Sequence, residues 1–140
     1  NEIRVNLIKN SLVFVFNSFG FGVGAGNSMY YMQNHAVYDT EGIINVHNWW
    51  FEILTEYGVF IFIGSVIFYV SLFIHLYNCY KKLEINEEKK ICEALLISLI
   101  IFFFASVSSS SILNLLPQWI LFSFGLGFLN YYRLKKEPCV

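Results

Sequence analysis

The sequence carries little charge. Only 14% of its 140 residues are Asp, Glu, Lys or Arg, whereas average soluble domains carry about a quarter. The apolar residues make up 56% of the chain and cluster in long runs, which favours a membrane protein over a buried soluble core. The formal net charge of −1 excludes a strongly basic surface for nucleic acid. We therefore expect an all-α, polytopic membrane protein that contacts lipid and has no nucleic-acid partner.

Metal-ligand patterns are also missing. The chain has three cysteines that each lie beside a cluster of basic residues, and they lack metal-binding spacing: Cys79, Cys92 and Cys139. A metal site built from His35, His47 and Glu52 is conceivable, but the spacing of these residues matches no zinc motif. We therefore expect no metal site and no cofactor.

An initiator Met and a signal peptide with a basic start and a small-residue cleavage site are absent as well. The chain opens in the middle of an expected helix, at residues 1–4. These features lead us to expect a fragment, namely the C-terminal portion of a longer protein whose N-terminal membrane segments are missing.

Three apolar runs predict membrane-spanning helices over about 59–79, 92–110 and 117–132. The first run continues for about 19 residues, which gives a helix of roughly 28 Å, enough to cross the hydrocarbon layer. The second run fades into four serines at 108–111, and Pro117 marks the break before the third. Residues 58–140 are thus predicted to form the membrane part of the chain.

The basic residues predict the topology. The loop 81–90 carries four lysines, and the tail carries Arg133, Lys135 and Lys136. Two spans separate the clusters, so both lie on one side, which the positive-inside rule assigns to the cytoplasm. Residues 1–57 then form an extracytoplasmic or interfacial region, away from cytosolic ATP and sugar nucleotides. An enzyme there needs a substrate that is already activated and carried by a lipid.

The stretch 46–58 holds the strongest candidate for chemistry, His47. Asn48 is a good N-cap, and Glu52 lies near the first turn, where the helix dipole favours negative charge. Two tryptophans follow the cap, and Trp prefers the membrane interface. His47 is therefore predicted at the membrane surface, before a helix that runs directly into the first span. There it either acts as a general base, oriented by Glu52, by Glu56 or by a residue of the missing part, or packs against Trp50.

The upstream region supplies candidate substrate contacts. Residues 3–19 predict an interfacial or partly buried helix, or the exit of a missing span. Within it, Arg4 either binds a diphosphate or snorkels to the interface. Glycine then recurs at every second position over 20–26, which indicates either a helix end with a tight loop or N–H groups that bind phosphate. Residues 28–45 predict a loop with one short helix, whose Tyr and Asn suit sugar binding. The candidate substrate-binding residues are Arg4, Gly22, Gly24, Gly26, Asn27, Asn48 and Glu52.

Three blocks carry a family resemblance. They are an Arg-led helix at 4–10, a glycine-rich turn at 19–27, and His-Asn followed by an aromatic-aliphatic helix that ends in Glu-x-Gly at 47–58. Together they resemble the O-antigen ligase and polymerase superfamily. The third block is most similar to Gram-positive members of the teichuronic acid polymerase type. The later spans and the basic tail also fit, so the resemblance covers nearly the whole chain.

The resemblance implies a multi-pass enzyme of the bacterial cytoplasmic (inner) membrane with a GT-C-like helical bundle. Such an enzyme is a metal-independent glycosyltransferase of cell-wall polysaccharide biosynthesis. It would transfer or polymerise a glycan from an undecaprenyl-diphosphate-linked donor to a glycan or lipid-linked acceptor on the outer face. By position, Arg4 matches the family's diphosphate-binding Arg, His47 its proposed base and Asn48 the neighbouring Asn.

Two other functions stay open. In a transporter or flippase fragment, Arg4 and His47 would bind or gate a lipid-linked or anionic substrate without bond making. Such proteins place ionisable residues within spans and often use broken helices near the midplane, whereas here the ionisable residues precede the first span. In a membrane scaffold, the polar region 1–57 would only dock a partner.

Overall fold

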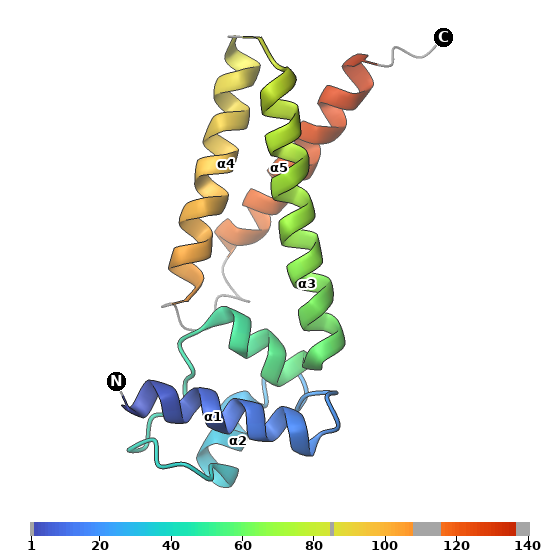
Figure 1. The fold of residues 1–140 in the computed structure, drawn as a ribbon. Coiled ribbons are helices and arrows are strands. Elements are labelled where there is room, and N and C mark those ends of the chain that lie inside the picture. Colours follow the sequence, from blue (N-terminus) through green and yellow to red (C-terminus); the bar gives the residue numbers. More distant parts are fainter. Residues whose placement is uncertain (1, 85, 108–115, 137–140) are drawn as a thin grey trace. The chain divides into compact units, whose positions relative to one another are not determined.

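The computed structural model describes residues 2–84, 86–107 and 116–136, and the regular secondary structure of these residues is entirely helical (Figure 1). The helices are α1 Glu2–Asn17, α2 Ser28–His35, α3 Trp49–Lys82, α4 Glu87–Ser106 and α5 Leu116–Lys136. The all-α prediction is therefore confirmed for the described part of the chain. The serine run at 108–111, where the second predicted span ends, and Cys139 lie outside the described residues.

The chain divides into two compact units, with the boundary inside α3. The first unit contains α1, α2 and α3 as far as Val66. Its core is a small cluster of buried residues contributed by α1, α2 and the segment before α3: Leu7, Phe14, Met32 and Val46. The second unit begins at Ile67 and contains the rest of α3, nearly all of α4, and α5.

α3 contains a sharp break. Gly58 adopts φ 81° and ψ −178°, a combination that essentially only glycine can take. The break separates a short segment at 49–57 from the long apolar segment that follows (Figure 1). The expectation that the helix after Asn48 runs directly into the apolar run therefore needs correction. The two segments meet at a corner, because backbone groups elsewhere in the first unit bind to the broken turn.

The second unit is held by apolar packing. The C-terminal part of α3 and α4 run antiparallel (Figure 1), and residues of α5 join them in one buried cluster. Its members are Leu72, Leu76, Cys79, Leu83, Cys92, Leu95, Leu96, Leu99 and Phe122. A polar contact adds to this packing, since the Tyr69 hydroxyl donates to the carbonyl oxygen of Leu99 at 2.7 Å.

Among the described helices, α3 is the one that is long and apolar enough to cross a membrane. Only 11% of its most apolar window is buried within the protein, and large side chains such as Phe60 and Ile67 are exposed. Such a surface suits contact with lipid. The two further predicted spans fall on α4 and α5, and they stay predictions.

Candidate functional site

The start of α3 is capped as predicted. The Asn48 side-chain oxygen accepts hydrogen bonds from the N–H groups of Trp50 at 3.1 Å and Phe51 at 3.3 Å. These are two of the donors that a helix N-terminus leaves without an intrahelical partner. The Asn48 carbonyl also accepts the Glu52 N–H at 2.9 Å. Asn48 is therefore the N-cap of α3, and its predicted substrate contact would have to come from the side-chain amide nitrogen.

His47 lies immediately before this cap, with an exposed side chain and a φ of 50°. Positive φ is uncommon for residues other than glycine, and such backbone conformations concentrate at functional sites. The His47 N–H donates to the side-chain oxygen of Asn45 at 3.1 Å, which holds the residue in this conformation. The imidazole is accordingly displayed on the surface at the N-terminus of α3, where it can reach a reacting group.

Two carboxyl groups follow on one face of α3, four residues apart. Glu52 is half-buried, and its pKa is raised from 4.5 to about 7, first by burial and then by the charge of Glu56. Glu52 belongs to the short segment before Gly58, outside the predicted span. A carboxyl group that titrates near neutral pH can accept and return a proton during a reaction.

Glu56 is the more buried carboxylate, at 5% exposure. It accepts a hydrogen bond of 2.6 Å from the hydroxyl of Ser28, the first residue of α2. Within the described residues, no ion pair involves Glu56. The four-residue spacing of Glu52 and Glu56 indicates in the sequence that these two side chains are neighbours. No sequence signal points to Ser28 as a partner of Glu56.

The glycine run binds to the broken turn of α3. The Val23 N–H donates to the Thr55 carbonyl at 2.8 Å, and the Gly24 N–H to the Glu56 carbonyl at 2.9 Å. In the opposite direction, the Val59 N–H donates to the Gly20 carbonyl at 2.8 Å. In a continuous helix the Thr55 carbonyl would accept from Val59. The run thus replaces hydrogen bonds that the break removes, as buried backbone groups require.

We call residues 20–24 together with Gly58 the glycine clasp. A Cβ atom at Gly22 would lie 2.7 Å from the Glu56 carbonyl oxygen and from the Gly58 nitrogen. A Cβ atom at Gly58 would overlap the Gly20 carbonyl oxygen and the backbone of Phe21. The two backbones therefore approach to a distance that only glycine permits at these positions.

The hydrogen bonds of the clasp help to decide whether the glycine run is a tight loop or a phosphate-binding site. The Gly22 N–H already donates to Ser18 Oγ at 2.9 Å. The Gly24 N–H already donates to the backbone carbonyl of Glu56. The Asn27 side chain donates to the Val23 carbonyl at 3.1 Å. Gly26 is exposed, and within the described residues its N–H has no hydrogen-bond acceptor. The tight-loop interpretation accounts for Gly22 and Gly24, and phosphate binding stays a prediction that depends on the exposed end of the run.

Arg4 lies in the first turn of α1 with an exposed side chain. Its neighbours Ile3 and Leu7 pack in the same cluster as Val46, which precedes His47. Arg4 and His47 thus belong to one unit and flank one apolar cluster. Among the described residues no hydrogen bond joins their side chains, and no three metal-ligating side chains gather there.

Comparison with known proteins relates the chain to a protein of polysaccharide biosynthesis. The chain is 39% identical, over 137 residues, to the teichuronic acid biosynthesis protein TuaE of Bacillus subtilis (strain 168). The alignment covers 98% of the chain but 28% of TuaE, so the chain spans little more than a quarter of this relative's length. No protein-family model and no solved structure matches the chain. The resemblance to Gram-positive teichuronic acid proteins is supported, and the superfamily assignment stays a prediction.

Proposed function

We propose that this chain is part of a multi-pass enzyme that transfers or polymerises lipid-diphosphate-linked glycans on the outer face of a bacterial cytoplasmic membrane. The observation that carries the proposal is the 39% identity to TuaE, which extends over nearly the whole chain. The geometry of the first unit supports it, since an exposed His47 on a strained backbone and a titratable Glu52 lie at one helix N-terminus.

In the proposed reaction, a hydroxyl oxygen of the acceptor attacks the anomeric carbon of the donor sugar. The bond between that carbon and the diphosphate oxygen breaks as the new glycosidic bond forms. His47 takes the hydroxyl proton as general base, and the lipid diphosphate leaves with the bonding electron pair. Arg4 would bind the diphosphate, because its guanidinium keeps its charge and pairs with two phosphate oxygens. Beside His47, Glu52 is the second side chain that could accept or return a proton in this reaction, because its pKa is raised to about 7.

The proposed membrane arrangement follows from the charges. α3 beyond Gly58, α4 and α5 would each cross the membrane, with the lysines at 81–90 and the basic tail in the cytoplasm. Residues 1–57 would then face outward, where undecaprenyl-diphosphate-linked substrates are available. A GT-C-like bundle would be completed by segments of the full-length protein.

The test is complementation by the full-length protein that carries His47→Ala or His47→Gln. We expect polymer on the cell surface to be lost or strongly shortened, because a general base contributes about 10²- to 10⁴-fold to rate. His35→Ala is the matched control, since His35 is an exposed histidine of the same unit at the end of α2. Membrane levels of all variants are compared by immunoblot. Normal polymer from both His47 variants would remove the base role.

A second candidate function, transport or flipping of the lipid-linked substrate, draws on the break at Gly58. Transporters often build substrate sites from interrupted helices, and α3 is interrupted where its apolar segment begins. The position of lipid-linked repeats in the His47→Ala strain separates the two functions. Accumulation on the outer leaflet supports the glycosyltransferase, and accumulation on the inner leaflet supports the transporter.

A further inference from the structure

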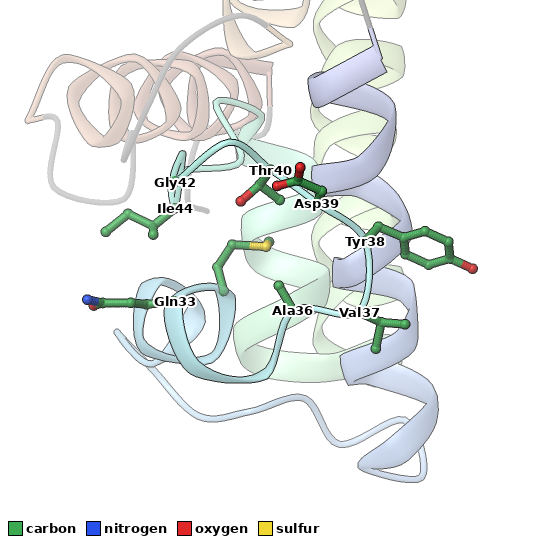
Figure 2. Close-up of a pocket in the computed structure, with 9 residues that line it drawn as sticks. Gln33, Ala36, Val37, Tyr38, Asp39, Thr40, Gly42 and Ile44 are labelled. Atoms are coloured by element: carbon green, nitrogen blue, oxygen red, sulfur yellow. The ribbon is translucent and has the colours of Figure 1, made fainter.

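A polar cavity of about 530 Å³ lies in the first unit, between α2 and the loop that follows it (Figure 2). None of His47, Glu52 and the glycine clasp lines it. Its walls come from the end of α2 and from the segment that leads toward α3. The lining residues are Met32, Gln33, Ala36, Val37, Tyr38, Asp39, Thr40, Gly42 and Ile44.

The loop that forms the cavity is fixed to α1 by asparagine side chains. The fully buried Asn10 accepts the N–H groups of Val37 and Tyr38, each at 2.9 Å, and donates to the Tyr38 carbonyl at 2.9 Å. Asn6 donates to the Asp39 carbonyl at 2.8 Å. These four hydrogen bonds hold the backbone of the cavity wall, so the wall is formed before a ligand arrives.

A tight turn positions the polar side chains. One carboxylate oxygen of Asp39 accepts the Glu41 N–H at 2.9 Å, and the Ile43 N–H donates to the Thr40 carbonyl at 2.9 Å. Glu41 and Gly42 both have positive φ, of 51° and 79°. The side chains of Asp39 and Thr40 lie next to each other (Figure 2). The second carboxylate oxygen and the Thr40 hydroxyl have no hydrogen-bond partner within the described residues.

The chemistry of the lining selects a class of ligand. It contains a carboxylate, an amide and the hydroxyls of Thr40 and Tyr38, but no Lys, Arg or His. A phosphate or an acidic sugar would therefore face Asp39 with no cation among the lining residues, and Lys9 Nζ lies outside the lining, 5.2 Å from the centre of the Tyr38 ring. A neutral sugar fits, because its hydroxyl groups can donate to Asp39 and exchange hydrogen bonds with Thr40. The partly exposed side chain of Ile44 offers apolar contact for the C–H face of a sugar ring.

We propose that this cavity binds an uncharged sugar unit of the glycan, as a subsite separate from the reacting centre. The proposal rests on the proposed function, since it supplies that enzyme with a second contact to its glycan. The volume is within the range of small-molecule sites, about 300–1,000 Å³, and has room for one or two sugar rings. Binding a sugar here would orient the chain whose end reaches His47.

The test measures binding by the purified full-length protein in lipid nanodiscs. The probe is a mixture of short oligosaccharides released from the surface polymer of the same bacterium, followed by saturation-transfer NMR. Asp39→Asn keeps a side-chain acceptor for the turn but removes the charge, and Thr40→Val removes only the hydroxyl. We expect each to weaken binding by about 2- to 10-fold, as for the loss of one hydrogen bond.

Glu41→Gln is the matched control, because Glu41 is an exposed neighbour whose side chain does not line the cavity. It should bind the oligosaccharides as the wild type does. Absence of binding by the wild type would overturn the proposal. So would binding that Asp39→Asn and Thr40→Val leave unchanged, or that Glu41→Gln weakens equally.

The same experiment separates the subsite from the proposed function. We expect His47→Ala to bind the oligosaccharides normally while polymer is lost from the cell. Normal polymer in His47→Ala together with intact binding would refute the catalytic role and leave the subsite standing. Competition by lipid-linked repeat extracted from membranes then tests which of the two substrates the cavity binds. Displacement of the oligosaccharides assigns the cavity to the donor, and simultaneous binding assigns it to the acceptor.

Discussion

The two units of this chain are stabilised in different ways. In the first unit, buried polar groups have specific partners: Asn10 binds loop backbone, Ser28 binds Glu56, and the glycine clasp binds a broken helix turn. In the second unit, the core is a cluster of leucines with Cys79, Cys92 and Phe122. Hydrogen bonds require particular atoms at particular distances, whereas apolar packing tolerates exchange of similar side chains.

The difference shows where function can be located. A helix packed by leucines can be rebuilt with other apolar residues at little cost, so its sequence carries little chemical information. The first unit instead fixes a loop, a helix corner and the Glu56 carboxylate with hydrogen bonds. Substitutions in the first unit should therefore be far less tolerated than equivalent substitutions in the second unit. Pairs of variants, one in each unit, can test this contrast.

The largest effect is expected from Gly58→Ala. An alanine there would adopt a backbone conformation that costs about 1–3 kcal/mol, and its Cβ would overlap the backbone of the glycine run. We expect the clasp to open and the level of folded protein in the membrane to fall sharply. Fluorescence-detected size-exclusion chromatography and a thermal melt of the full-length protein measure both.

Gly127→Ala is the counterpart in the second unit. Gly127 lies in α5, and a Cβ there would meet nothing within 4 Å. Because alanine is favoured over glycine in helices by up to about 1 kcal/mol, this variant should match or exceed the wild type in stability. Equal behaviour of Gly58→Ala and Gly127→Ala would show that the glycine clasp does not hold the corner of α3.

A smaller effect is expected from Asn10→Leu. Leucine has a similar size but cannot bind the backbone of Val37 and Tyr38. Leaving such groups without partners costs about 1–3 kcal/mol. In the second unit, Leu99→Met should cost less than about 1.5 kcal/mol. Hydrogen exchange of residues 36–41 should accelerate in Asn10→Leu and stay unchanged in Leu99→Met. Unchanged exchange in both variants would contradict the anchoring role of Asn10.

Local features of the fold were predictable from the sequence. The cap at Asn48, a helix predicted over residues 3–19 and a short helix within residues 28–45 follow from side chains close to each element, and the structure has helices at Glu2–Asn17 and Ser28–His35. The third block already ended at Gly58, but the sharp corner that the backbone makes there was not predictable. The residues around it favour a helix, and the partners that stabilise the break lie in the glycine run, distant in the sequence.

The candidate site shows the same division. The spacing of Glu52 and Glu56 places both carboxyl groups on one helix face, so their interaction could be read from the sequence. The bond from Ser28 to Glu56 joins residues that are 28 positions apart, and the loop anchored by Asn10 has a similar separation. Pairings of this kind depend on how the helices pack, and no local pattern predicts them.

The smallest effect concerns the pH dependence of stability. The pKa of Glu52 is raised to about 7 by burial and by Glu56. A carboxyl group with a higher pKa in the folded chain binds its proton more tightly there than in the unfolded chain. The resulting stabilisation is complete below the ordinary pKa of 4.5 and is lost as the pH rises through about 7. Glu52→Gln should remove this contribution, so its melting temperature should exceed that of the wild type above pH 7.

Two control variants sharpen this prediction. Glu56→Gln removes the charge that opposes ionisation of Glu52, so the loss of stability between pH 5 and pH 8 should be smaller than in the wild type and should be complete at a lower pH. Glu41→Gln removes an exposed carboxylate of the same unit and should leave the profile unchanged. Melting temperatures of the four proteins between pH 5 and pH 8 give the answer. Parallel profiles for wild type and Glu52→Gln would mean that Glu52 stays ionised throughout, and the carboxyl pair could then not serve as a proton acceptor at neutral pH.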